Sequence, residues 1–141
     1  MNYYIIAESF ETSAAWSDVM PLIDTVKKRL HEEYAKRNLP GRSFVTARVT
    51  QLYRTGAAIY FYFGFCYKGV ANPSQVYLEL ENIAREEILR SGGSLSHHHG
   101  VGKLRKAFLP EIMSETALAW KREIKRSADP ANVFGAGNQG L

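Results

Sequence analysis

Residues 92–106, GGSLSHHHGVGKLRK, concentrate groups that can exchange protons or hold an anion. His97, His98 and His99 follow one pair of glycines and precede another, and the sequence has only one further histidine, His31. Glycines let a backbone bend sharply and approach a ligand, while imidazoles exchange protons near neutral pH. The segment therefore predicts an acid–base site, although exposed or capping histidines would show the same residue types.

A metal site fits this segment less well. Adjacent side chains of an extended chain point in opposite directions, so at most His97 and His99 could share an ion. No cysteine is near, and the next acid along the chain is Glu111. Zinc requires three or four well-placed ligands. We therefore expect no metal here, and we expect the basic residues that follow to contact a phosphate or the solvent.

Two glycine motifs resemble nucleotide-binding signatures but lack their context. GAGNQG at 135–140 matches G-x-G-x-x-G, yet only Leu141 follows, whereas the fingerprint requires a helix after it. GVGK at 100–103 resembles a phosphate-binding loop, but His97 stands where the first glycine belongs and leucine follows the lysine. Neither motif supports a nucleotide site.

The aromatic run at 57–69, AAIYFYFGFCYKG, predicts the best-patterned strand of the sequence. Alternate residues face opposite sides of a strand. One side is predicted core: Ile59, Phe61, Phe63, Phe65 and Tyr67. The other side carries hydroxyls and a glycine, as expected for the lining of a pocket: Ala58, Tyr60, Tyr62, Gly64 and Cys66. Cys66 is the only cysteine, which favours a reducing compartment, and we expect a small buried side chain rather than a nucleophile.

The remaining elements alternate between strands and helices. Strands are expected at 3–10 and 43–53. One helix is expected at 18–38, with Asp18 as its N-cap. A second helix is expected from 72 to 92, with Asn72 as its cap and Gln75 in a capping box. A final helix is expected at 110–126, with a buried stripe of Met113, Ala117, Trp120 and Ile124, followed by an irregular tail. The order β-α-β-β-α predicts an α+β fold, a ferredoxin-like antiparallel sheet covered by helices, in one domain over residues 1–141.

Composition limits the partners. The 141 residues carry a net charge of +4, and 45% of them are hydrophobic, which is typical of a globular domain. Lysines and arginines are scattered beside acids on expected helices, so we expect no nucleic-acid partner. No run is long enough for a membrane helix, MNYYIIAESF lacks the features of a signal peptide, and the final QGL is not the peroxisomal S-K-L signal.

Four stretches, YYIIAESFETSAAW, RVTQLYRTGAAIYFYFGF, GGSLSHHHGVGKLRK and DPANVFG, together resemble the C-terminal part of the alkylglycerone phosphate synthases. These enzymes share the plan of the FAD-linked oxidases of the vanillyl-alcohol-oxidase type. The resemblance implies a cap or substrate domain whose FAD-binding domain, with noncovalently held FAD, is not part of this chain. It also implies that the 141 residues alone are inactive.

The resemblance implies peroxisomal ether-lipid synthesis without net redox chemistry. An acyl-dihydroxyacetone phosphate exchanges its acyl chain for a long-chain fatty alcohol, and a fatty acid leaves. Tyr60 would be the proton donor and acceptor, and His97, His98 and His99 would be needed for activity. The tail residues Ala136, Gly137, Asn138, Gln139 and Gly140 would reach the active site. A homodimer and peripheral membrane contact are further expectations.

Two other hypotheses stay open. The chain could be the cap of another FAD-linked oxidase acting on a hydroxy acid, which would be expected to show a lone histidine in this loop. It could also be an independent ferredoxin-like binding module, against which the abrupt start of the first strand argues.

Overall fold

The computed structural model describes residues 3–141, which group into two compact units. The first unit ends at His98, and the second comprises His99–Leu141. Within the described residues, no helix is sufficiently long and apolar to cross a membrane.

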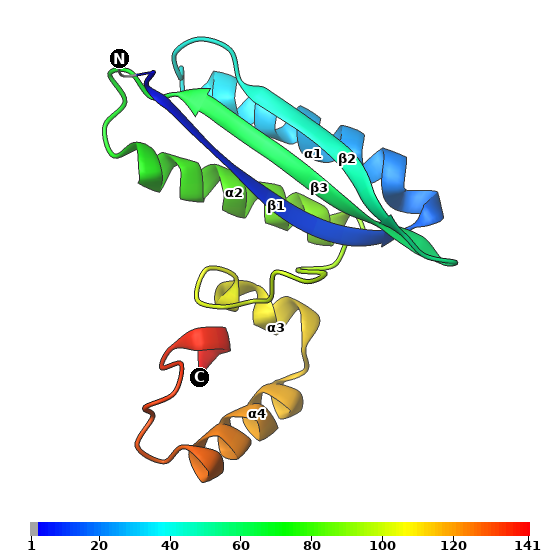
Figure 1. Ribbon diagram of the computed structural model, residues 1–141, viewed down its shortest axis with the longest axis vertical. Helices are drawn as coiled ribbons and strands as arrows, with labels where there is room; N and C mark the ends of the chain where they lie inside the picture. Colours follow the sequence, from blue (N-terminus) through cyan, green and yellow to red (C-terminus); the bar gives the residue numbers. More distant parts are fainter. Residues whose placement is uncertain (1–2) are drawn as a thin grey trace. The chain divides into compact units, whose positions relative to one another are not determined.

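The first unit is a two-layer α+β structure, as predicted. Its elements are β1 (Ile5–Ala15), α1 (Trp16–Lys36), β2 (Phe44–Leu52), β3 (Gly56–Cys66) and α2 (Pro73–Arg90). The three strands form an antiparallel sheet in the order β1-β3-β2. Both helices cover the same face of this sheet, so no helix of this unit lies on its other face (Figure 1).

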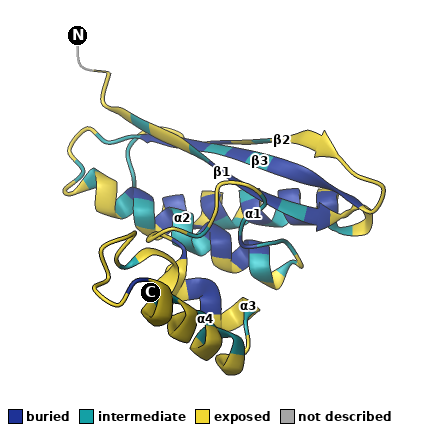
Figure 2. Cartoon of the chain, turned by 60° about the horizontal axis from the view of Figure 1, so that its bottom comes forward, coloured by how far each residue is buried: buried dark blue, intermediate teal, exposed yellow. Residues whose placement is uncertain are grey.

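The core lies between the sheet and the two helices, and the alternation predicted for β3 is confirmed. Ile59, Phe61 and Phe63 are fully buried on the helix-covered side, and Phe65 is 2% exposed. Figure 2 shows the buried residues concentrated where β3 meets α1 and α2. The other side of β3 carries Tyr60 and Tyr62, which are partly buried, as is Cys66.

The predicted helix caps are only partly correct. β1 extends to Ala15 and α1 begins at Trp16, so Asp18 lies in the first turn and is not the N-cap. Asn72 precedes α2, but it adopts the left-handed conformation with φ 49° and its side chain makes no capping bond. Gln75 instead donates to Glu79. Gly92 ends the helix as expected, at φ 80°.

The free edge of β1 is covered by the segment that follows α2. Ser94 N–H donates to the Ser13 carbonyl at 2.9 Å, and Ser13 N–H donates to the Ser94 hydroxyl at 2.9 Å. The Thr12 hydroxyl donates to the Ser94 carbonyl at 2.7 Å. Gly93 packs against the core here, because an added Cβ would lie 2.7 Å from side-chain atoms of Ile88 and Leu22.

The second unit differs from the single helix predicted at 110–126. A short helix, α3 (Leu109–Ile112), ends at Met113, which is extended, and Ser114 caps a separate helix, α4 (Glu115–Ala128), by accepting from Ala117 N–H at 3.2 Å. No residue of α4 is buried, and Trp120 and Ile124 are each 70% exposed. Figure 2 shows this helix with exposed residues along its length. The predicted core stripe is therefore wrong: helical spacing identified an apolar face but not what covers it.

The sequence DPANVFG forms a turn organised by Asp129. Its carboxylate accepts from Val133 N–H at 2.9 Å and from Phe134 N–H at 2.8 Å, and it pairs with the Lys125 ammonium. The ammonium and the two amides lower the pKa of Asp129 to about 2. The charge is therefore retained as the pH falls through the ordinary range of a carboxyl, and these contacts are lost only as the pH approaches about 2.

Gly93→Ala should destabilise the first unit by about 1–3 kcal/mol, because the new methyl group must displace core side chains. The free energy of unfolding, measured by denaturant titration, tests this. The control is Gly92→Asn, since asparagine tolerates a left-handed backbone and the nearest atom to an added Cβ is 3.8 Å away. Equal stability of the two variants would show that the core does not fix this segment.

Candidate active site

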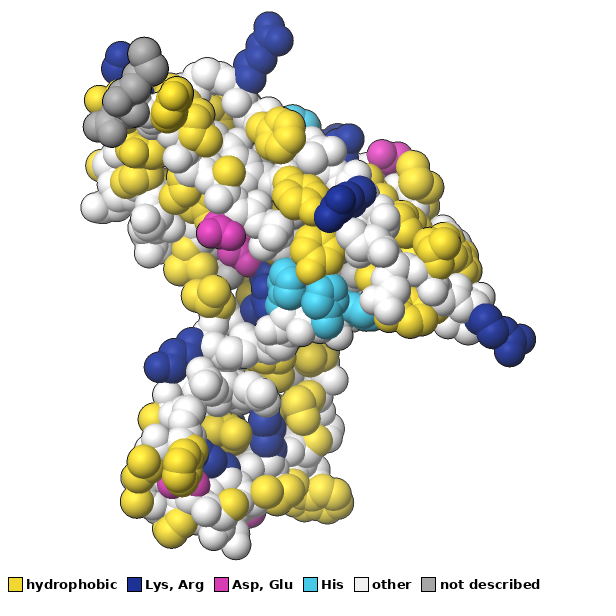
Figure 3. Space-filling view, viewed as in Figure 1, with side chains coloured by type: hydrophobic (Ala, Val, Ile, Leu, Met, Phe, Trp, Pro, Cys, Tyr) yellow, Lys and Arg dark blue, Asp and Glu magenta, His cyan; other side chains and the backbone are white. Residues whose placement is uncertain are grey.

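Tyr60 and His98 meet on the helix-free face of the sheet. Tyr60 stands near the middle of β3, and its hydroxyl oxygen lies 2.6 Å from His98 Nε2. The two ring centroids are 5.4 Å apart. Figure 3 shows imidazoles gathered beside apolar and aromatic side chains on this face. The structure thus brings together two of the residues that the sequence analysis singled out.

His97 makes a second contact of the same kind. Its Nε2 lies 2.8 Å from the hydroxyl oxygen of Tyr53, the residue that follows β2. The Nδ1 atoms of His97 and His98 lie 2.7 Å apart, and the two rings are nearly perpendicular, at 87°. The four rings therefore form one continuous hydrogen-bonded chain, in the order Tyr53, His97, His98, Tyr60.

A buried carboxylate holds the backbone of this segment. Glu11 is fully buried on β1, and its two oxygens accept from the Ser96 hydroxyl at 2.6 Å and from His97 N–H at 2.6 Å. Hydrogen bonds to a carboxylate are short and strong, and a buried carboxylate is costly without them. Glu11 therefore fixes the point from which the imidazoles extend.

The register of the sheet places Glu11 beside Tyr60. In the antiparallel pairing of β1 with β3, Glu11 is the direct partner of Tyr60, and Ser13 is the partner of Ala58. Directly paired residues point to the same face, so the polar alternation of Ser9, Glu11 and Ser13 lies on the helix-free side. Tyr60 and the Glu11 carboxylate thus share a face because of register.

Leu95 is anchored as well. Its side chain is 4% exposed, and its carbonyl accepts from the guanidinium of Arg85, a residue of α2 that is 2% exposed, at 3.3 Å. With the contacts of Ser94, Ser96 and His97, each residue from 94 to 97 has a partner on β1 or α2. The segment is a loop, but these contacts hold it in place.

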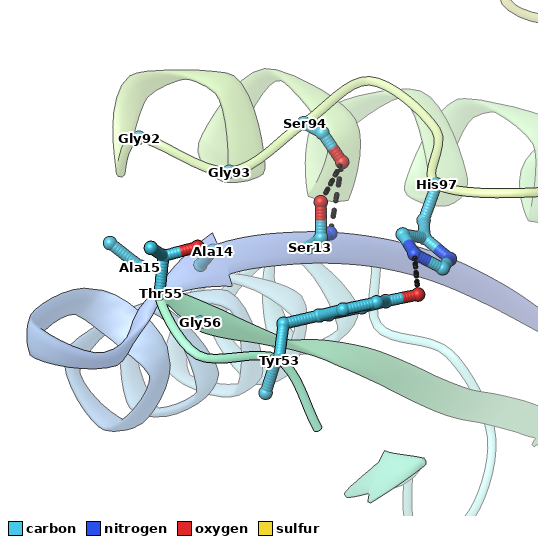
Figure 4. A pocket seen from close by; sticks show the side chains of 11 residues that line it. Ser13, Ala14, Ala15, Tyr53, Thr55, Gly56, Gly92, Gly93, Ser94 and His97 are labelled. Carbon is cyan, nitrogen blue, oxygen red and sulfur yellow. Dashed lines mark hydrogen bonds between the residues drawn. The ribbon is translucent and has the colours of Figure 1, made fainter. Parts of the chain in front are cut away.

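A hollow of about 510 Å³ opens beside the Tyr53–His97 pair. Figure 4 shows both side chains at one side of it, with Ser13 bonded to Ser94 nearby. Most of the other lining residues are small: Ala14, Ala15, Gly56, Ala57, Gly92 and Gly93. An added Cβ on Gly56 would lie 2.1 Å from the Ala14 carbonyl oxygen, so close strand packing requires this glycine. With a volume of about 510 Å³, the hollow is large enough for a small organic molecule or several waters.

One step of the metal argument from sequence was wrong. Glu11, His97 and His98 offer ligand atoms within 4.8 Å of one another, so the neighbouring histidines converge and a carboxylate joins them. The extended-chain argument failed because residues 91–98 follow an irregular path. The Glu11 oxygens accept from Ser96 and from the His97 amide, and the two Nδ1 atoms contact each other, so these groups have partners without an ion. The absence of a metal stays a prediction.

His99 and the tail belong to the second unit. There the tail folds back on the glycine-rich segment: Gln139 N–H donates to the Gly102 carbonyl at 2.7 Å, and Lys121 Nζ donates to the Gln139 carbonyl at 3.1 Å. Burial lowers the pKa of Lys121. Arg105 is buried and donates to the Gly100 carbonyl, so this basic residue shapes the loop. An active-site role for Ala136, Gly137, Asn138, Gln139 and Gly140 stays a prediction.

The sequence analysis missed Glu11 and Tyr53. Glu11 lies one residue beyond the predicted end of the first strand, although the alternation of polar residues at 9, 11 and 13 could have extended that strand. Tyr53 was included in the predicted second strand without a role. Its partner is 44 residues away in sequence, and no local pattern indicates such a contact.

A sequence family described as FAD linked oxidases, C-terminal domain, matches residues 1–138. The chain is 42% identical over 138 residues to alkyldihydroxyacetonephosphate synthase of Caenorhabditis elegans, covering 98% of this chain and 23% of that protein. It is 28% identical over 131 residues to the enzyme of the same name from Trypanosoma brucei brucei, covering 93% and 21%.

A solved structure of alkyldihydroxyacetonephosphate synthase aligns with a TM-score of 0.63 at 16% sequence identity, covering 94% of this chain and 21% of that one. At this identity the match concerns the fold. An uncharacterized FAD-linked oxidoreductase of Escherichia coli (strain K12) is 26% identical over 131 residues, covering 90% and 26%. The chain thus spans between a fifth and somewhat over a quarter of the length of these relatives.

Glu11→Gln should loosen the histidine segment, because glutamine has one side-chain acceptor oxygen where glutamate has two. We expect a loss of about 1–3 kcal/mol in unfolding free energy and faster hydrogen exchange at the His97 amide. The matched control is Glu8→Gln, an exposed carboxylate on the same strand. If both variants leave exchange at the His97 amide unchanged, the carboxylate does not hold the loop.

Proposed function

The chain belongs to the family of FAD-linked oxidases, as their C-terminal domain, and we propose that it is the substrate-side domain of an alkyldihydroxyacetonephosphate synthase. In this proposal the complete enzyme exchanges the acyl chain of acyl-dihydroxyacetone phosphate for a long-chain fatty alcohol without net redox chemistry. The 42% identity to the Caenorhabditis elegans enzyme, across 98% of this chain, supports the choice of reaction.

The contact that carries the proposal is the 2.6 Å pair of the Tyr60 hydroxyl with His98 Nε2. The exchange requires a proton to leave the substrate carbon beside the carbonyl and to return later. Phenols are almost entirely protonated at neutral pH, so a tyrosine acts as a base only with a partner that takes its proton. His98 occupies that position, and Tyr60 is the group that would face the substrate.

The helix-free face fits one side of a flat ring system. Ala58 and Gly64 flank Tyr60 and Tyr62 on this face of β3, and their small size leaves room above the strand. The Arg48 guanidinium lies 5.4 Å from the Tyr62 ring centroid. The glycine-rich segment at 100–103 does not open a long helix, as a diphosphate site would require. We infer that this chain contacts the ring end of FAD and that another domain holds the diphosphate. FAD supplies an electrophilic ring that binds and activates the substrate.

Further expectations belong to the same proposal. The partners would be the two lipid substrates, the enzyme's own FAD-binding domain and a second copy of the chain, and the location would be the peroxisome, with peripheral contact to a membrane. Each of these expectations is open to direct test.

Tyr60→Phe should abolish the chemistry while leaving the fold and the FAD content of the complete enzyme intact. The expected loss is roughly 10²–10⁴-fold, the usual size of a general acid–base contribution. His98→Ala and His99→Ala should also lower activity. The direct measurement is exchange of the substrate's proton with solvent in the absence of alcohol. Exchange by Tyr60→Phe at the unmodified rate would assign the tyrosine to packing.

The 141 residues alone should fold but should neither retain stoichiometric FAD nor turn over. The reason is a complete core in the first unit beside only one side of a flavin site. Equilibrium dialysis with FAD and the visible absorption spectrum of the purified chain provide the test. A yellow, stoichiometric complex would contradict the division between domains.

A further inference from the structure

We propose that Tyr53, His97, His98 and Tyr60 form a proton relay that connects the substrate-facing phenol with the hollow beside Tyr53. This inference rests on the proposed role of Tyr60 as the group that exchanges the substrate's proton. Its structural basis is separate: three consecutive contacts of 2.8, 2.7 and 2.6 Å join the four side chains from Tyr53 to Tyr60.

Each imidazole in the chain uses both of its nitrogens. His98 contacts Tyr60 through Nε2 and His97 through Nδ1, while His97 contacts Tyr53 through Nε2. An imidazole that accepts a proton at one nitrogen and releases one from the other transmits a proton without a lasting charge. The 2.7 Å contact between the two Nδ1 atoms requires one proton between them, so the tautomers of the two rings are coupled.

The transfer balances without any further reagent. Tyr60 passes its hydroxyl proton to His98 Nε2, and His98 passes its Nδ1 proton to His97 Nδ1. His97 passes its Nε2 proton to the Tyr53 oxygen, and Tyr53 releases its own proton to water in the hollow. The Tyr60 phenolate then accepts the proton from the substrate carbon, and the electron pair of that C–H bond moves toward the neighbouring carbonyl. The reverse sequence returns a proton.

The surroundings suit this transfer. The Glu11 carboxylate presents an oxygen within 4.8 Å of nitrogens of both imidazoles, so its charge favours a proton passing between them. Glu11 and Arg85 also hold the backbone of the segment, which keeps the three contacts short. Tyr53 is 43% exposed and lines the hollow, so the outer end of the relay meets solvent.

Tyr53→Phe in the complete flavoenzyme tests the relay. It keeps the ring against His97, whose centroid is 5.5 Å away, and removes only the terminal hydroxyl. Exchange of the substrate's proton with solvent should slow roughly tenfold, less than for a direct acid–base residue. Added imidazole should restore the rate, because the hollow of about 510 Å³ beside His97 can admit a small buffer molecule. If Tyr53 had only a structural role, added imidazole would not raise the exchange rate of the variant.

The matched control is Tyr67→Phe. It removes the hydroxyl of a phenol that directly follows the C-terminal end of β3, and it should leave the exchange rate unchanged. If Tyr60→Phe is inactive but Tyr53→Phe exchanges at the unmodified rate, the relay is wrong and the proposed function stands. If Tyr60→Phe is fully active, the proposed role of Tyr60 in the reaction is wrong, and the relay is wrong with it.

A readout that does not depend on the reaction uses ¹⁵N-histidine NMR of the 141-residue chain. His97 and His98 should show complementary tautomers, one protonated at Nδ1 and the other at Nε2. Tyr53→Phe should change the tautomer balance of His98 as well as that of His97, although Tyr53 contacts only His97 among these two. Two imidazoles that both carry the proton on Nε2, or that respond independently, would overturn the relay.

Discussion

The site depends on one buried carboxylate. Glu11 is fully buried, and its oxygens bind the Ser96 hydroxyl and the His97 amide. Leaving such a carboxylate without hydrogen bonds would cost several kcal/mol, so the loop must return to this point on β1 once the sheet has formed. The position of the imidazoles is therefore a consequence of folding, and no ligand is needed to bring them beside the two tyrosines.

The loop also occupies the place that a further strand would take. In a ferredoxin-like arrangement a fourth strand would pair with β1, whose free edge would otherwise expose backbone donors and acceptors. Here Ser94 satisfies that edge with its backbone and its hydroxyl, and the chain then departs from extended geometry. Because the segment is not a strand, the side chains of His97 and His98 need not alternate, so His97 reaches Tyr53 while His98 reaches Tyr60.

The sequence was informative where structure is local. The two faces of β3 and the glycine that ends α2 follow from alternation and helix-capping rules, and both are confirmed. Glu11 and Tyr53 were missed because their shared partner, His97, lies 86 and 44 residues away in sequence. Only the register of the folded sheet brings Glu11 and Tyr53 to the same loop. The stripe of α4 was misassigned for a different reason: periodicity reveals an apolar face, but Trp120 and Ile124 face solvent in this chain.

All three strands contribute to the four-ring chain and its support. Tyr60 comes from β3, Tyr53 follows β2, and Glu11 on β1 holds the histidines. A shift of one residue in either strand pairing would turn Tyr60 away from Glu11 or from the end of β2 that carries Tyr53. The β-bulge between Val49 and Gln51 has the same importance for β2. The register shift at that position decides which residues of the end of β2 face the site. The precise placement of the four rings is thus supplied by the backbone pairing of a small sheet, while the glycines only let the loop reach it.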